Sequence, residues 1–150
     1  MRICIGSDHG GFELKKQLIE YLVSGGHDVH DMGAQVMDST DDYPDFAIPV
    51  AEAVAKDPAS RGIVICRSGV GVCIAANKVK GIRSYLALSE EILGSACAHD
   101  HINVLALSGD HTAVDDAIRY VDMFLSTPVD RDARHERRLR KIDEYEDAHR

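Results

Sequence analysis

Two kinds of hydrophobic pattern alternate along the whole chain. Short apolar runs typical of buried strands occupy residues 2–7, 27–31, 62–66, 82–88 and 103–107. Segments that favour helix lie between and after them, at residues 12–24, 46–56, 72–78, 89–99 and 114–125. In the first of these, Leu14, Leu18 and Leu22 are four residues apart and define one apolar face. Because crossover helices must cover the faces of a parallel sheet, the alternation predicts an α/β fold with five parallel strands.

No linker, repeat or low-complexity tract interrupts the pattern, so residues 1–150 are expected to form one domain. The segment 131–150 differs in composition, because six of the chain's 17 basic residues fall within 11 positions there. Its apolar stripe, Leu139, Ile142 and Tyr145, is too narrow to hold a helix folded alone in water. We therefore expect an extra, basic C-terminal helix that packs on its own domain or on a partner subunit. The alternative is a solvated charged tail.

Composition excludes several classes of protein. The net charge of -8 argues against a nucleic-acid or anionic-membrane surface. No stretch approaches the length of a membrane span, and Met1 leads directly into a strand rather than into a signal peptide. We therefore expect a cytoplasmic protein without nucleic-acid or membrane partners. The four cysteines form no CxxC pair and no zinc-ribbon spacing, which indicates free thiols.

The most informative stretch, 62–83, places a strand, a glycine turn and a helix within 22 residues. This order brings the backbone N–H groups around Gly69 and Gly71 to one point, which attracts negative charge. Cys66 ends the strand at the lip of that turn, where the helix N-terminus and Arg67 favour its thiolate form. A thiolate there is a candidate nucleophile or general base. The alternatives are an inert core cysteine and glycines that serve only a tight turn.

Nucleotide and metal motifs are weak. Gly69-x-Gly71 continues to Ile74 where the dinucleotide fingerprint requires glycine or alanine, and no P-loop Gly-Lys-Ser/Thr follows. The His-Asp-His sequence at 99–101 lacks the thiolate or carboxylate spacing that completes a known ligand set. We therefore expect neither a nucleotide cofactor nor a metal.

Ligands of parallel α/β folds bind at the carboxyl ends of the strands. The loops that begin at Asp8, Cys66 and Ser108, together with the loop over 32–43, are therefore expected to share one edge of the sheet. Three histidines are candidate partners for the thiol: His9, His99 and His101. A simpler role for Asp8 is that of a helix cap.

Five sequence blocks carry a resemblance to a known family. They are SDHGGF at 7–12, DYPDFA at 42–47, GIVICRSGVGVCIAANKVKGIR at 62–83, HDHINVLAL at 99–107 and RHERR at 134–138. In order and spacing they resemble the type B ribose-5-phosphate isomerases, a family that includes the galactose-6-phosphate and allose-6-phosphate isomerases. The resemblance implies a Rossmann-like three-layer αβα sandwich. It also implies a metal-independent, cofactor-free interconversion of ribose 5-phosphate and ribulose 5-phosphate through an enediolate.

The resemblance further implies a role for particular residues. The implied catalytic residues are Cys66, the base that moves a proton between C1 and C2, His99, which helps to open the sugar ring, and Asp8 and Ser68, which contact the substrate. The implied phosphate ligands are His9, Arg134 and Arg138, Tyr43 lines the sugar pocket, and Asn103 with the amides of Gly69, Val70 and Gly71 holds the enediolate oxygen. Members are homodimers or homotetramers that build each site from two subunits.

One position departs from the family pattern. Asp110 stands where members usually carry a phosphate-binding arginine after the fifth strand, and a carboxylate there repels a phosphate. Arg67, where glycine is common, is a candidate substitute that enters the same pocket. The alternatives are a different sugar phosphate, such as allose or galactose 6-phosphate or a tetrose phosphate, and a non-catalytic small-molecule-binding domain.

Overall fold

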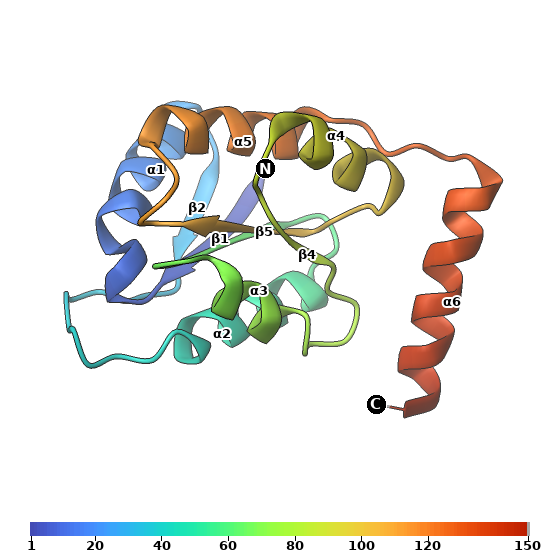
Figure 1. The fold of residues 1–150 in the computed structure, drawn as a ribbon, viewed down its shortest axis with the longest axis horizontal. Helices are drawn as coiled ribbons and strands as arrows, with labels where there is room; N and C mark the ends of the chain where they lie inside the picture. The colour runs from blue at the N-terminus through green and yellow to red at the C-terminus, as the bar shows by residue number, and fades with distance from the viewer. Residues whose placement is uncertain (150) are drawn as a thin grey trace.

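The computed structural model describes residues 1–149 as a parallel sheet between two layers of helices (Figure 1). The strands are β1 (Arg2–Ser7), β2 (Asp28–Asp31), β3 (Arg61–Cys66), β4 (Ser84–Leu86) and β5 (Val104–Ser108). The helices are α1 (Phe12–Ser24), α2 (Pro44–Lys56), α3 (Val70–Ala76), α4 (Glu90–His99), α5 (Val114–Ser126) and α6 (Ala133–His149), with a short 3-10 turn, η1 (His9–Gly11). The strand order is β2-β1-β3-β5-β4, and every pair is parallel. The predicted fold class is confirmed.

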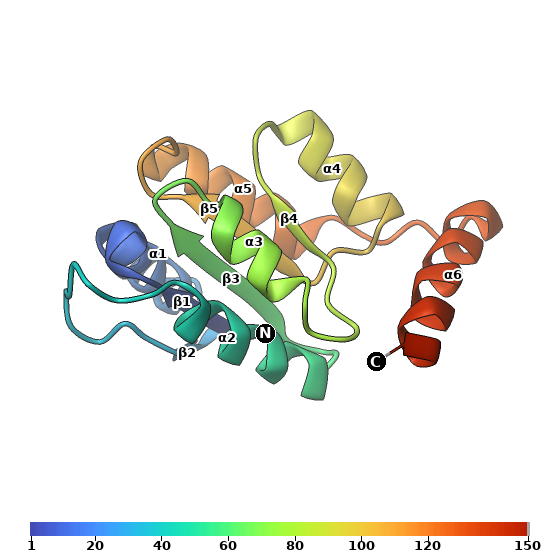
Figure 2. The same ribbon diagram turned by 60° about the horizontal axis from the view of Figure 1, so that its bottom comes forward.

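The alternation of side chains along each strand builds a core on both faces of the sheet. On one face, Ile63 and Ile65 pack among α1, α4 and α5. On the other, Val64 and Cys66 pack among α2 and α3. Figure 2 shows these two helices on the same side of the sheet. Both faces are buried, which is why the strands read as continuous apolar runs. Among the described residues, no helix is long and apolar enough to cross a membrane.

The boundaries of two predicted elements differ from the structure for local reasons. The expected strand 82–88 shortens to β4. Before β4, the side-chain oxygen of Asn103 accepts from the backbone N–H of Arg83 at 2.8 Å, in place of a hydrogen bond between strands. The expected helix 72–78 begins two residues earlier, because Gly69 takes the left-handed conformation with a φ of 77°. Ser89 caps α4 as predicted, accepting from the backbone N–H of Ile92.

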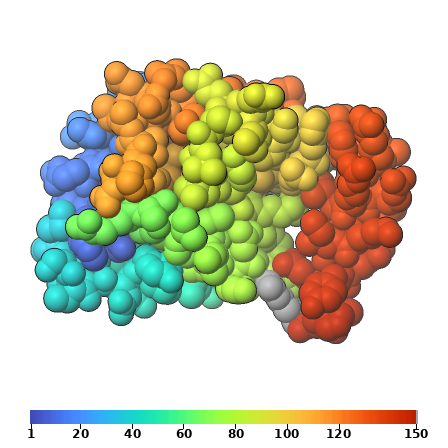
Figure 3. All heavy atoms as spheres, viewed as in Figure 1, coloured from blue at the N-terminus to red at the C-terminus, as the bar shows by residue number. Residues whose placement is uncertain are grey.

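Helix α6 lies beside the body of the domain and is joined to it along one side (Figure 3). Leu139 is buried, and a carboxylate oxygen of Glu146 accepts from the backbone N–H of Gly81 at 2.8 Å. Lys80 pairs with Asp147 at 2.5 Å. Residues 133–149 thus form a helix that contacts the domain of the same chain, while its packing on a partner subunit stays a prediction. Arg150, the last residue of the predicted basic segment, lies outside the described residues.

A buried lysine fixes the start of the long loop after β2. Lys15 on α1 is only 1% exposed, and its Nζ donates to Asp31 Oδ1 at 2.6 Å and to the carbonyl oxygen of Ala34 at 2.7 Å. The carbonyl of Gly33 then accepts from the backbone N–H of Ser7 at 2.8 Å. Since a buried ammonium is stable only when its hydrogen bonds are satisfied, this pairing ties the loop to the carboxyl end of β1.

Replacing Lys15 by methionine tests this anchor. Methionine keeps an unbranched side chain of similar length but leaves the carbonyl of Ala34 and part of the Asp31 carboxylate unpaired. We therefore expect a loss of about 3 kcal/mol in the free energy of unfolding. The matched control is Lys16→Met, because Lys16 is exposed, with Glu13 at 4.0 Å from its Nζ and the centroid of the Phe12 ring at 5.9 Å. Urea denaturation measures both, and equal losses for the two variants would contradict the anchor.

Candidate active site

The loops after β1, β3 and β5 meet at the carboxyl end of the sheet and are packed backbone against backbone. The backbone N–H of Gly109 donates to the carbonyl of Cys66 at 2.8 Å, and that of Asp110 donates to the carbonyl of Arg67 at 3.0 Å. A Cβ on Gly109 would lie 2.1 Å from the carbonyl oxygen of Gly10, and one on Gly10 would lie 2.4 Å from Cγ of Arg67. Glycine is therefore required at both positions, and the three loops hold one another in place.

Cys66 lies under the glycine turn with its sulfur directed at the backbone. The Sγ atom accepts a hydrogen bond from the N–H of Gly69 at 3.2 Å, and the residue is 4% exposed. The hydroxyl of Ser68 accepts from the N–H of Val70 at 3.3 Å. Two of the three amides expected to hold an oxyanion are thus engaged within their own loop. The hydrogen bond from Gly69 N–H therefore fixes the position of the sulfur at the start of α3.

Asp8 and His9 lie at the same edge and are held by different partners. Asp8 is buried and its Oδ1 accepts from the N–H of Gly10 at 2.9 Å, which is the capping role considered from the sequence. Burial raises the pKa of its carboxyl group, although the hydrogen bond from Gly10 opposes the shift. His9 contacts Asp41 twice, through its backbone N–H at 3.0 Å and its Nδ1 at 2.6 Å. Sequence reasoning missed Asp41, because nothing in the loop 32–43 singles it out among several aspartates.

Tyr43 and Arg67 complete this edge. The ring of Tyr43 lies against Gly71, where an added Cβ would approach Cζ to 2.8 Å. The guanidinium of Arg67 pairs with Asp110 at 3.3 Å, and both side chains are well exposed. The stem of Arg67 passes over Gly10, so this cation lies next to the loop that carries His9. The four predicted loops share one edge, as expected.

The remaining predicted residues lie at the opposite edge. His99 ends α4, and Asn103 precedes β5, where its carbonyl accepts from the N–H of Gly62 at 3.0 Å. Gly62 and Cys66 are four residues apart in β3, a span of about 13 Å at roughly 3.3 Å per residue. Within one chain, the expectation that His99 or its neighbour His101 pairs with the thiol is therefore wrong. The reason is the polarity of the sheet: a helix returns its last residue to the amino ends of the strands.

The side chains of Asn103, Arg134 and Arg138 also lie away from Cys66. The side-chain oxygen of Asn103 accepts from Arg83 N–H, and its Nδ2 donates to the carbonyl of Gly81 at 2.8 Å, so the amide already fastens a loop. Arg134 and Arg138 are exposed on α6, and Arg134 pairs with Asp132 at 3.4 Å. Neither arginine lies at the edge that carries Cys66.

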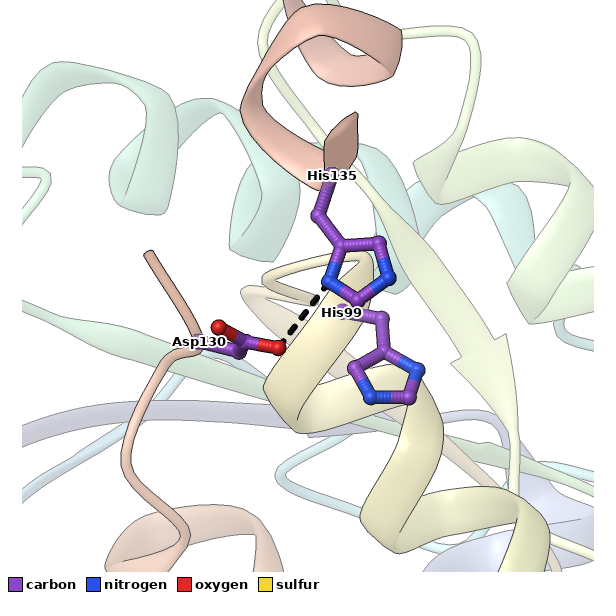
Figure 4. A group of neighbouring side chains, drawn as sticks. All are labelled: His99, Asp130 and His135. Carbon is purple, nitrogen blue, oxygen red and sulfur yellow. Dashed lines mark hydrogen bonds and ion pairs between the residues drawn. The ribbon is translucent and has the colours of Figure 1, made fainter. Parts of the chain in front are cut away.

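His99 stacks on a second histidine that sequence reasoning did not single out (Figure 4). The rings of His99 and His135 have centroids 4.2 Å apart and planes tilted by 33°, and His135 Nδ1 lies 3.1 Å from Asp130 Oδ2. The available signal was weak: an aspartate and a histidine five residues apart at the start of the last helix.

Two groups of possible metal ligands occur among residues 1–149. They are His99, Asp130 and His135, and Asp8, His9 and Asp41, each with donor atoms within 4.8 Å of one another. Imidazole lone pairs lie in the ring planes, so the stacked rings of the first group do not converge on one ion. In the second group, His9 Nδ1 is bonded to Asp41 Oδ1, and Asp8 Oδ1 accepts from Gly10. Hydrogen bonds account for the second group and for the pairing of His135 with Asp130, and the expectation of no metal stays a prediction.

Comparison with known proteins supports one class. The sequence profile described as Ribose/Galactose Isomerase matches residues 3–142. Ribose-5-phosphate isomerase B of Mycolicibacterium paratuberculosis is 44% identical over 149 residues, which are 99% of this chain and 94% of that protein. The crystal structure of ribose-5-phosphate isomerase B from Mycoplasma genitalium with bound ribulose-5-phosphate superposes with a TM-score of 0.92 at 45% identity, covering 97% of this chain and 96% of that one. The enzyme from Clostridium thermocellum gives 0.93 at 40% identity with complete coverage of both chains.

The layered fold, the cysteine at the carboxyl edge and these full-length matches define an aldose–ketose isomerase. The chain belongs to the Ribose/Galactose Isomerase family.

The loop packing makes a prediction about glycine. In Gly109→Ala the new Cβ meets the backbone of Gly10, so the loops must separate, and we expect a loss of about 1 to 3 kcal/mol in the free energy of unfolding. The control is Gly94→Ala in the middle of α4, where the nearest atom is Met123 Sδ at 3.8 Å. That change should stabilise the protein by about 0.5 to 1 kcal/mol. Thermal or urea unfolding measures both, and a stabilising Gly109→Ala would refute the packing argument.

Proposed function

We propose that the chain interconverts ribose 5-phosphate and ribulose 5-phosphate through an enediolate, with Cys66 as the base. The observation that carries the proposal is the placement of the Cys66 sulfur at the carboxyl edge, where it accepts from Gly69 N–H beside Asp8 and Ser68. The bound ribulose-5-phosphate of the Mycoplasma genitalium enzyme, at 45% identity, supports the choice of a pentose phosphate.

The reaction requires a base and a stabilised oxyanion. In the open-chain aldose, the thiolate of Cys66 removes the proton from C2, the electrons form a C1=C2 double bond, and the negative charge moves to the C1 oxygen. A proton then passes from the C2 hydroxyl to the C1 oxygen, and the thiol returns its proton to C1 as the C2 oxygen becomes the ketone. Asp8 and Ser68 bind sugar hydroxyls, and Tyr43 lines the pocket. Fixed N–H donors stabilise the developing oxyanion without reorganisation, and each is typically worth about 2.7 to 4 kcal/mol. The amide of Gly71 is the first candidate, with Val70 N–H joining it when the hydroxyl of Ser68 turns to the sugar.

The second half of the site comes from another copy of the chain in this proposal. His99, which helps to open the sugar ring, and Arg134 and Arg138, which bind the phosphate, lie at the opposite edge from Cys66. Two exposed apolar side chains on α3, Val70 and Ile74, lie beside the edge that carries Cys66 and suit a subunit contact. A homodimer or homotetramer therefore builds each site from two subunits. Asn103, whose amide fastens Gly81 and Arg83, supports the site through that loop.

The phosphate end depends on Arg67 and Asp110. His9 and Arg67 are each paired with a carboxylate at this edge, so a phosphate must compete with Asp41 and Asp110 for them. Arg67 suits this exchange because its guanidinium is exposed and its stem is fixed over Gly10. Asp110 also favours a second candidate, namely the same chemistry on a sugar phosphate of another length, such as a hexose 6-phosphate or a tetrose phosphate.

Removal of the thiol tests the base. We expect Cys66→Ala to lower turnover of ribose 5-phosphate by about 10²- to 10⁴-fold, because general-base catalysis is lost. Formation of ribulose 5-phosphate in heavy water, with deuterium incorporated from solvent, is the readout. The control is Cys97→Ala on α4, which carries none of the loops at this edge. Burial raises the pKa of the Cys97 thiol to about 11, so this thiol stays protonated at neutral pH. Nearly unchanged turnover in Cys66→Ala would refute the proposed base.

Substitution of Arg67 tests the phosphate end. We expect Arg67→Ala to raise KM for ribose 5-phosphate by about 10-fold or more while kcat changes little, since a charge-assisted contact is worth about 1.5 to 3 kcal/mol. Asp110→Ala should lower KM, because Arg67 loses its competing partner. Arg2→Ala is the control, an exposed arginine paired with Asp57 at 3.7 Å on the first strand. The second candidate is favoured if a hexose 6-phosphate gives the same ranking of KM among these variants and a higher kcat/KM than ribose 5-phosphate.

A further inference from the structure

Asp130 is anchored against the end of helix α4. Its backbone N–H donates to the carbonyl of Ala98 at 2.8 Å, and its own carbonyl lies 2.9 Å from His101 Nε2. Its Oδ1 accepts from the N–H of Asp132 at 2.8 Å, which leaves Oδ2 directed at His135. The contacts of the Asp130 backbone with Ala98 and His101 therefore fix its carboxylate relative to the turn that carries His99.

This carboxylate in turn fixes a buried imidazole. His135 is 6% exposed, and its Nδ1 lies 3.1 Å from Asp130 Oδ2. The N–H of Asp132, with smaller contributions from His135 and His99, holds the pKa of the Asp130 carboxyl below its usual value. An ionised carboxylate only accepts hydrogen bonds, so the Nδ1 of His135 carries the proton and donates.

The fixed ring of His135 packs against the ring of His99 and limits the orientations that His99 can adopt. Figure 4 shows the two rings next to each other, one from the end of α4 and one from the first turn of α6, and their planes are tilted by 33°. An exposed histidine without such a neighbour is free to exchange between side-chain rotamers. The chain from Asp130 through His135 therefore selects one orientation of an otherwise exposed imidazole.

We propose that His135 and Asp130 are positioning residues that hold His99 for the ring-opening step. The proposal rests on the proposed function, in which ribose 5-phosphate enters as a cyclic hemiacetal. In ring opening, the bond between C1 and the ring oxygen breaks, and the ring oxygen gains a proton. The hydroxyl on C1 loses a proton and becomes the aldehyde, so no electrons are gained or lost overall. A correctly oriented imidazole transfers such a proton, and misorientation slows only this step.

The opposite substrate separates ring opening from the enediolate chemistry. In ribulose 5-phosphate the oxygen on C5 is esterified, so the ketone cannot close a five-membered ring, and the sugar stays open. Exchange of its C1 protons with heavy water therefore requires Cys66 but no ring opening. A residue that only positions His99 should affect turnover of ribose 5-phosphate and spare this exchange.

The experiment compares His135→Asn and Asp130→Asn with the wild-type protein in both assays. We expect turnover of ribose 5-phosphate to fall by about 10-fold or more in His135→Asn, and by less in Asp130→Asn, with the exchange rate of ribulose 5-phosphate retained. His135→Phe, which keeps a stacked ring, should recover part of the loss. The matched control is His30→Gln, because His30 Nε2 also lies 3.1 Å from a carboxylate, that of Asp28, on the edge strand β2.

A second measurement reports on position without using activity. The ring-carbon protons of His99 lie over the His135 ring and should show an upfield ring-current shift in NMR spectra, which His135→Asn removes and His30→Gln preserves. Equal losses in both assays, or an unchanged His99 resonance, would overturn the positioning role. An active wild-type protein whose His135→Asn variant turns over ribose 5-phosphate normally would overturn this inference alone. A wild-type protein inactive on both sugars would overturn the proposed function and this role with it.

Discussion

The parallel register of β1, β3 and β5 is the constraint on which the rest of the structure depends. Because Ser7, Ile65 and Leu107 lie side by side at the end of their strands, the loops that follow must meet at one edge. The close approach of Gly10, Arg67 and Gly109 is possible only because two of these residues lack a side chain. The same polarity returns helix ends to the opposite edge, and this separates His99 from Cys66.

The fold could be predicted well from the sequence because it depends on two patterns that are each local in the chain. Continuous apolar runs identify strands buried on two faces, and the glycine turn after Cys66 identifies the strand that carries the candidate site. Prediction failed where a position depends on contacts between distant segments. The burial of Lys15, the pairing of His9 with Asp41 and the stack of His99 on His135 join residues far apart in the chain. His99 lies at the edge of the sheet to which α4 returns the chain. The alternation of strands and helices implies this position, but the residue type of His99 does not.

In the proposed enzyme, charge pairing determines how an acidic protein holds a phosphate. His9 and Arg67 are each matched by a carboxylate at the carboxyl edge, so the edge carries little net positive charge before a ligand arrives. Arg134 and Arg138 bring cations from a helix at the other edge. In the proposed enzyme, a second copy therefore supplies both positive charge and the imidazole of His99. The thiol and the glycine turn supply the chemistry that follows ring opening.

Subunit complementation tests this central claim most directly. Cys66→Ala and a variant with alanine at both Arg134 and Arg138 are co-expressed with different tags, and the mixed oligomer is purified and assayed with ribose 5-phosphate below the wild-type KM. Each variant alone should have little activity. A mixed dimer contains one site with the intact thiol of one subunit and the intact arginines of the other, so activity should return. A mixed oligomer no more active than the two separate variants would contradict a site shared between two copies.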